Sequence, residues 1–163
     1  MSQLLRLADT EATLEFGRIL AEGLSAEPGF AILMEGDLGS GKTTLVRGLV
    51  SALPGGAEAE VSSPSFTICN LYPTCPEVAH FDLYRQMGSA PDDQYCESLE
   101  SPSTLVVVEW AQYLAPRDWP ESVLRLTWQP AETGRLVKLE ALGRAAEGYL
   151  HGISGKLRRF AAS

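Results

Sequence analysis

Residues 36–44 read Gly-Asp-Leu-Gly-Ser-Gly-Lys-Thr-Thr and match the phosphate-binding pattern G-x-x-x-x-G-K-[ST] at every required position. Glycines let the backbone turn so that several N–H groups point at one phosphate, and a helix that begins at Lys42 adds the positive end of its dipole. Lys42 can reach β- and γ-phosphate oxygens, while the Thr43 hydroxyl can coordinate Mg²⁺. The segment predicts a nucleoside triphosphate site that uses the whole loop: Gly36, Asp37, Leu38, Gly39, Ser40, Gly41, Lys42, Thr43 and Thr44.

Two carboxylates follow apolar runs, Asp82 after residues 78–81 and Glu109 after residues 105–108. In an open α/β sheet, ligands lie beyond the carboxyl ends of the strands, so both side chains are expected to meet the phosphates. One carboxylate can hold Mg²⁺ directly or through water, and a second can orient or deprotonate the attacking water. The candidate catalytic residues are therefore Lys42, Asp82 and Glu109, and the candidate metal ligands are Thr43, Asp82 and Glu109. Which carboxylate contacts the metal directly stays open, and helix capping is the alternative role for each.

Other polar or aromatic positions allow two interpretations. The hydroxyl-rich residues 62–67 are either a loop that closes over a γ-phosphate or simply part of a strand. His80 is either part of the site or a buried sheet histidine. Trp110 is either a lid or part of the core, and Arg85 pairs either with a carboxylate or with phosphate.

The expected elements place these residues at one edge of a sheet. An apolar run over residues 30–34 leads into the phosphate loop, and apolar residues at helical spacing follow it through residue 53. An earlier helix is expected from Asp9 or Thr10 to the Pro-Gly pair at residues 28–29. The β-branched run at residues 105–108 is typical of a strand buried on both faces of a parallel sheet.

Two further strands, residues 123–128 and 135–141, are separated by a turn-like segment and predict a hairpin. Residues 61–72 are expected to be extended, and residues 86–103 are expected to be irregular. The predicted fold class is α/β, a three-layer P-loop NTPase fold with a mainly parallel central sheet and antiparallel additions.

The length of 163 residues and a 45% share of hydrophobic residues favour one domain over residues 1–163. With the phosphate loop in it, the expectation is a single P-loop ATPase domain. A net charge of −8 disfavours direct binding of nucleic acid. Three cysteines without metal-site spacing, and no apolar run of about 18 residues, predict a cytoplasmic protein that makes no contact with a membrane. The basic residues 156–160 are interpreted as a solvated helix end, with a partner or RNA contact as the alternative.

Four motifs in one order, residues 36–44, 63–67, 80–85 and 108–110, closely resemble the TsaE (YjeE) family. These are small bacterial ATPases required for threonylcarbamoyl modification of adenosine in tRNA, and the resemblance spans residues 9 to about 142. It implies a compact P-loop fold, Mg²⁺-dependent ATP hydrolysis and assembly with the TsaB and TsaD proteins. The tRNA would be reached indirectly, through that complex.

By this resemblance Thr43 and Glu109 are metal ligands and Asp82 is an essential acid near the metal. Ser65 and Thr67 would belong to a switch-like loop that contacts the nucleotide. Arg135 and the Asp9-Thr10 start of the first helix match positions near the adenine. The chain departs from the family at Ser65, where Thr is usual, and at residues 92–97, which replace the usual Gly-Leu-Glu-Glu-like helix.

The leading hypothesis is a slow ATPase that depends on its partners, and the alternative is a small-molecule kinase of the P-loop class. Kinases usually add an arginine-rich lid, whereas residues 86–103 contain no Arg or Lys. A nucleotide-dependent binding module without catalysis is a third possibility, which the presence of Asp82 and Glu109 disfavours.

Overall fold

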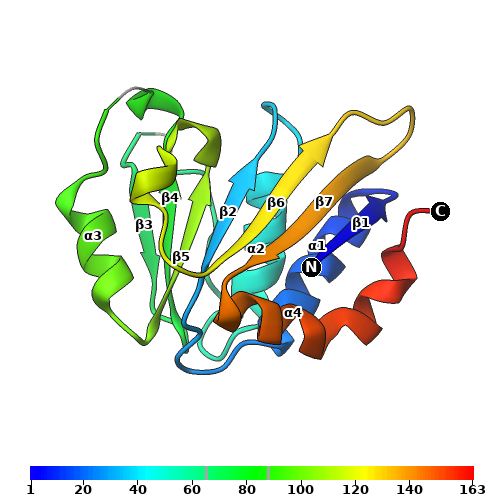
Figure 1. Cartoon of the computed structure of the whole chain (residues 1–163), viewed down its shortest axis with the longest axis horizontal. Coiled ribbons are helices and arrows are strands. Elements are labelled where there is room, and N and C mark those ends of the chain that lie inside the picture. Colours follow the sequence, from blue (N-terminus) through cyan, green and yellow to red (C-terminus); the bar gives the residue numbers. More distant parts are fainter. Residues whose placement is uncertain (65, 88) are drawn as a thin grey trace.

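The apolar runs form one mixed sheet in the computed structural model, which describes residues 1–64, 66–87 and 89–163 (Figure 1). Within these residues the sheet has seven strands in the order β1-β7-β6-β2-β5-β4-β3. The strands are β1 (Ser2–Leu7), β2 (Ala31–Glu35), β3 (Cys69–Tyr72), β4 (Glu77–Asp82), β5 (Thr104–Glu109), β6 (Val123–Gln129) and β7 (Arg135–Leu142). The α-helices are α1 (Thr10–Glu22), α2 (Lys42–Ala52), α3 (Asp93–Glu100) and α4 (Arg144–Leu157).

The centre of the sheet is parallel and its edges are antiparallel. Strands β6, β2, β5 and β4 run in the same direction, whereas β7 and β3 run in the opposite direction. Strand β1 pairs antiparallel with β7 at the edge of the sheet. Strands β2 and β5, in the middle of the sheet, are apolar and almost fully buried, as expected for strands covered on both faces. The β6–β7 hairpin forms as predicted, and the predicted α/β class with a mainly parallel centre is confirmed.

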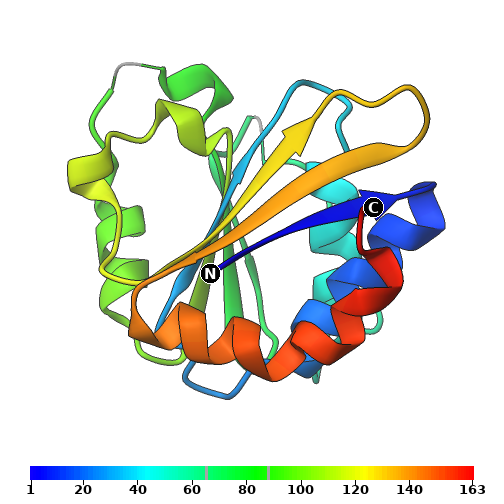
Figure 2. The same ribbon diagram turned by 45° about the vertical axis from the view of Figure 1, so that its right-hand side comes forward.

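Helices cover both faces of the sheet and make three layers (Figure 2). Helices α1, α2 and α4 pack on one face over a large apolar core that includes Phe16, Leu49 and Leu150. Helix α3 lies on the other face over a smaller cluster, in which Tyr95 packs edge-on against Phe81 with 5.7 Å between ring centroids. No helix in the described part of the chain is long and apolar enough to cross a membrane.

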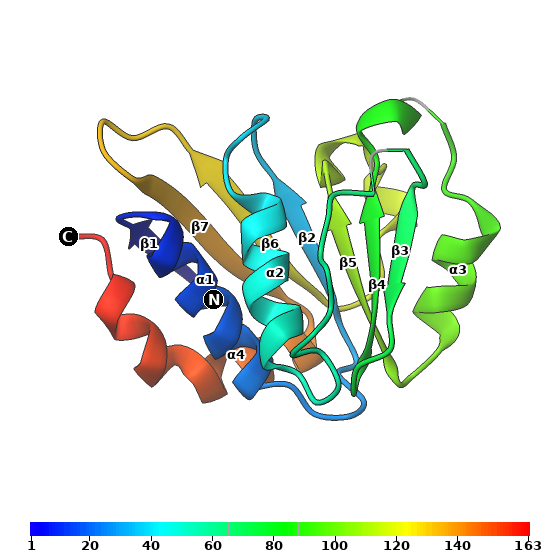
Figure 3. The ribbon, with the colours of Figure 1, turned by 180° about the vertical axis from the view of Figure 1, so that it is seen from behind.

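Helices α1 and α2 lie side by side on the sheet and cross at two glycines (Figure 3). A Cβ atom on Gly17 would lie 2.4 Å from the Leu45 carbonyl oxygen, and one on Gly48 would lie 2.3 Å from the Leu14 carbonyl oxygen. Only glycine permits such close backbone contact. Helix α1 begins where predicted, because the Asp9 carboxylate caps it by accepting a 2.8 Å hydrogen bond from the Ala12 N–H.

Two expectations about secondary structure were wrong. Residues 86–103 are not irregular throughout, since α3 forms where Asp92 caps the Tyr95 N–H and the Tyr95 ring is buried against the sheet. Residues 61–72 are not extended throughout: among the described residues of this segment only Cys69–Tyr72 forms a strand, and residues 66 and 67 form a turn. Strand β1, which was not expected, pairs with β7.

The basic C-terminal segment packs against α1. Lys156 forms a 2.7 Å ion pair with Glu22, and Arg159 forms a 3.2 Å ion pair with Glu15. Leu157 and Phe160 are buried beside them. The segment is a helix end, as interpreted, but its apolar side chains belong to the core.

The glycine crossing generates a test of stability. Gly17→Ala is expected to destabilise the protein by about 1–3 kcal/mol, because its methyl group forces α1 and α2 apart. Gly152→Ala in α4 is the matched control: no atom lies within 4 Å of its Cβ position, and alanine there is expected to stabilise by roughly 0.5–1 kcal/mol. Urea unfolding of both variants measures the difference, and equal effects would contradict the tight crossing.

Candidate functional site

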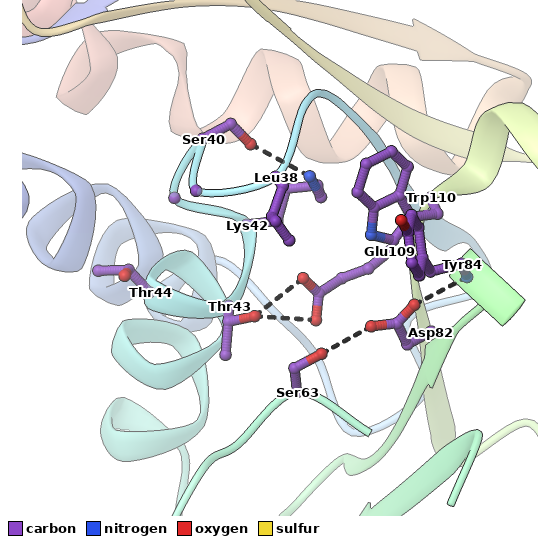
Figure 4. A pocket seen from close by; sticks show the side chains of 12 residues that line it. Leu38, Ser40, Lys42, Thr43, Thr44, Ser63, Asp82, Tyr84, Glu109 and Trp110 are labelled. Atoms are coloured by element: carbon purple, nitrogen blue, oxygen red, sulfur yellow. Dashed lines mark hydrogen bonds between the residues drawn. The ribbon is translucent and has the colours of Figure 1, made fainter. Parts of the chain in front are cut away.

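A cavity of about 290 Å³ lies where β4 and β5 end and α2 begins. Figure 4 shows the side chains that line it, which come from the phosphate loop and from both strand ends. The lining residues are Leu38, Gly39, Ser40, Gly41, Lys42, Thr43, Thr44, Ser63, Asp82, Tyr84, Glu109 and Trp110. Residues 38–44 of the predicted phosphate loop and both predicted carboxylates therefore share one cavity, whereas Gly36 and Asp37 do not line it.

The phosphate loop turns sharply between β2 and α2. Gly39 and Gly41 have φ angles of 73° and 109°, a region that strongly favours glycine. Gly41 precedes the first residue of α2 and offers no side chain to cap the helix. The first N–H groups of α2 and the positive end of its dipole are thus available to an anion in the cavity.

Lys42 lies within the loop and is only 5% exposed. Its Nζ donates to the carbonyl oxygens of Gly36 and Asp37 at 2.6 and 2.8 Å, and to the Ser40 hydroxyl at 3.2 Å. Burial lowers the pKa of Lys42, while the nearby carboxylates oppose that shift. These hydrogen bonds go to uncharged oxygens, which phosphate oxygens can replace.

Thr43, Glu109 and His80 form a chain of contacts across the cavity. The Thr43 hydroxyl donates to the Glu109 carboxylate, 2.9 Å from Oε1 and 3.2 Å from Oε2. Glu109 is 3% exposed, and its Oε2 lies 2.5 Å from Nε2 of the fully buried His80. His80 thus contacts the site instead of serving only as a sheet residue.

Asp82 lies directly beside Glu109, because the two residues are paired in the β4–β5 register. Its Oδ2 accepts a 2.6 Å hydrogen bond from the Ser63 hydroxyl, and its Oδ1 accepts a 2.9 Å hydrogen bond from the Tyr84 N–H. The polar side of the cavity is therefore built from oxygen atoms of Thr43, Asp82 and Glu109, the hard ligands that Mg²⁺ prefers. In the described part of the chain no three His, Cys, Asp or Glu side chains form a metal cluster by themselves. A magnesium ion would need the Thr43 hydroxyl, water and phosphate oxygens to complete its shell.

A second cavity of about 310 Å³ shares Gly39, Ser40, Gly41 and Thr44 with the first. Its other lining residues come from the start of α1 and the start of β7, and they are Leu7, Ala8, Asp9, Thr10, Thr13, Gly134 and Arg135. The Arg135 guanidinium donates to the Gly39 carbonyl oxygen at 3.3 Å. Thr10 and Arg135, 125 positions apart in the chain, therefore meet beside the phosphate loop.

Some predicted residues are placed elsewhere. Thr67 is exposed and outside both cavities, and its hydroxyl donates to the Asn70 side chain at 3.2 Å. Ser65 lies outside the described residues. The Arg85 guanidinium stacks on the Phe66 ring at 4.3 Å, an arrangement that neither alternative for Arg85 anticipated.

Ser63 and Tyr84 line the first cavity but were not named as binding positions. Ser63 falls in the hydroxyl-rich segment and Tyr84 closely follows Asp82, so neighbouring positions were the available signal. Trp110 also lines this cavity, at a place that suits the first of its two interpretations, a lid. Trp110 has a φ of 59°, unusual for a bulky residue, and its ring lies 4.3 Å from the Lys42 ammonium. It packs on Tyr84 and Tyr113 with centroid distances of 4.9 and 5.9 Å. The rings of Trp110 and Tyr84 line one side of the cavity (Figure 4).

Comparison with known proteins identifies similar chains. The family model described as "Threonylcarbamoyl adenosine biosynthesis protein TsaE" matches residues 7–137. The chain is 41% identical over 111 residues to the tRNA threonylcarbamoyladenosine biosynthesis protein TsaE of Nostoc sp., covering 65% of this chain and 66% of that one. It is 39% identical over 113 residues to the protein of the same description from Synechocystis sp., covering 66% and 69%. The match thus spans about two thirds of the length of these curated relatives.

A solved structure, that of Bacillus subtilis YdiB, has a similar fold. It superimposes with a TM-score of 0.77 over 96% of each chain at 24% sequence identity. The likeness supports the P-loop architecture of the chain.

The second cavity generates a test of nucleotide binding. Arg135→Ala is expected to weaken ATP binding by about 1 kcal/mol, or roughly five-fold in Kd, because the variant loses a charged donor beside the phosphate loop. Arg158→Ala, an exposed position outside these cavities, is the control and is expected to bind as the parent does. Titration calorimetry measures both, and unchanged affinity of Arg135→Ala would remove Arg135 from the nucleotide site.

Proposed function

Because this chain belongs to the TsaE family, we propose that it hydrolyses ATP with Mg²⁺ to support threonylcarbamoyl modification of adenosine in tRNA, together with TsaB and TsaD. This role belongs in the cytoplasm, within a single P-loop ATPase domain. The observation that carries the proposal is that Lys42, Thr43, Asp82 and Glu109 line one cavity at the start of α2. The family name supports the pathway, and the chemistry of these side chains supports the reaction.

The phosphate loop would bind the triphosphate by exchange of hydrogen bonds. Lys42 would leave the carbonyl oxygens of Gly36 and Asp37 for β- and γ-phosphate oxygens. The Trp110 ring, 4.3 Å from the Lys42 ammonium, would limit the access of water to that group. The α2 dipole would add a fixed positive potential at the same place.

The two carboxylates would have different roles, one toward the metal ion and one toward the attacking water. Thr43 and Glu109 are in contact, so we assign both to the metal side of the site. Mg²⁺, when bound, would neutralise charge on the β- and γ-phosphates. Asp82, held by the Ser63 hydroxyl and the Tyr84 N–H, would orient the attacking water.

The small-molecule kinase is the alternative function. Among the described residues that line the first cavity, Lys42 is the one basic side chain. A kinase normally needs further cations to hold phosphate during transfer and a pocket for the acceptor. The segment at residues 86–103 contains no Arg or Lys and includes α3, which packs on the sheet. These features favour transfer to water.

Binding and turnover should separate in two variants. Lys42→Ala is expected to weaken ATP binding on the order of 10²-fold, since the phosphates lose their charged partner. Glu109→Gln is expected to keep ATP binding but to lower kcat by about 10²-fold to 10³-fold. Lys138→Ala, on the surface of β7, is the control for loss of a lysine. Calorimetry and phosphate release measure the two effects; full turnover by Glu109→Gln would exclude its proposed role.

The partner proposal has its own test. Addition of purified TsaB and TsaD is expected to raise ATP turnover at least about 10-fold, because their contacts complete the positioning of water. Inorganic phosphate should accumulate without any phosphorylated metabolite. Stoichiometric formation of a metabolite phosphate would instead establish the kinase. Binding of tRNA is expected only in the presence of both partners, given the net charge of −8.

A further inference from the structure

His80 is a buried polar residue that the proposed reaction does not yet use. It lies in β4 two residues before Asp82, and its side chain is fully buried. Its Nε2 lies 2.5 Å from the Glu109 Oε2, while the Tyr72 ring packs nearby with 6.1 Å between ring centroids. The His80 side chain therefore contacts the Glu109 carboxylate from within the sheet.

The hydrogen-bonding partners define the form of the imidazole. Glu109 is an acceptor, so the proton of this contact belongs to Nε2 of His80. The other ring nitrogen, Nδ1, has no partner among the described residues. The contact with Glu109 therefore requires the proton on Nε2.

The Glu109 carboxylate is held at two points. His80 donates to Oε2, and Thr43 donates at 2.9 Å to Oε1 and at 3.2 Å to Oε2. When the Thr43 hydroxyl turns toward a metal ion, the His80 contact remains and keeps Oε2 in place. Oε1 is then the oxygen presented to the cavity.

We propose that His80 is a positioning residue which fixes Oε2 of Glu109 so that Oε1 faces the metal ion. This inference rests on the proposed function, since it concerns the same magnesium site. Residues that orient metal ligands typically contribute about 10-fold to 100-fold in metal affinity or activity. A histidine that served only to pack the sheet would have no such effect.

A matched pair of variants tests the proposal. Glutamine and methionine are similar in length, but only glutamine can donate from a position close to that of the histidine Nε2. Binding of Mn²⁺, used as a probe for Mg²⁺, is measured by electron paramagnetic resonance of the free ion with ADP-saturated protein. His80→Met is expected to weaken Mn²⁺ binding about 10-fold or more, and His80→Gln to restore most of it. The Kd for ADP in EDTA is expected to be equal in both variants.

The outcomes separate the two proposals. Equal losses in His80→Met and His80→Gln, or no loss in His80→Met, would overturn the positioning role while leaving the metal site intact. A parent protein that binds no Mn²⁺ beyond that bound by ADP alone would contradict the proposed function, and the positioning role with it.

A measurement on the parent protein covers the case in which a variant does not fold. Nitrogen-15 NMR of the histidine side chains is expected to show His80 protonated at Nε2, with the Nε2 signal shifted in Glu109→Gln. Protonation at Nδ1 alone would overturn the inference.

Discussion

The parallel pairing of β5 with β2 on one side and β4 on the other is the constraint on which the site depends. In this register Glu109 pairs with Asp82 at the end of β4, and it also pairs with Met34, which lies just before the phosphate loop. Because parallel strands end at the same edge, a loop and two carboxylates that are far apart in the chain are brought together. A shift of one residue in either register would turn one of these side chains to the opposite face of the sheet.

Three charged residues are buried together at this edge of the sheet. Lys42, Asp82 and Glu109 are each no more than 5% exposed, so their charges are weakly screened by water and depend on fixed hydrogen bonds. The cation is held by carbonyl oxygens, and the anions by hydroxyl, N–H and imidazole donors. Each charged group therefore has its own set of hydrogen-bonding dipoles, which offset the cost of burying its charge.

Much of this was readable from the sequence, because the relevant signals are local. The phosphate loop is a contiguous motif, the two carboxylates directly follow apolar strands, and Asp9 is an ordinary helix cap. What was missed depends on contacts between distant segments: α3 needs Tyr95 to pack on Phe81, and β1 needs the edge of β7. The role of Ser63 depends on its approach to Asp82, and Thr67 turns away toward Asn70, which neighbouring residues alone do not reveal.

The glycine crossing of α1 and α2 has a mechanical consequence. The start of α1 lines one cavity and the start of α2 lines the other, and backbone contact at Gly17 and Gly48 leaves no side-chain layer in which the helices can slide. The crossing therefore fixes the start of α1 relative to the start of α2. The two cavities that meet at the phosphate loop are thus held at one spacing by two glycines that lie outside both of them.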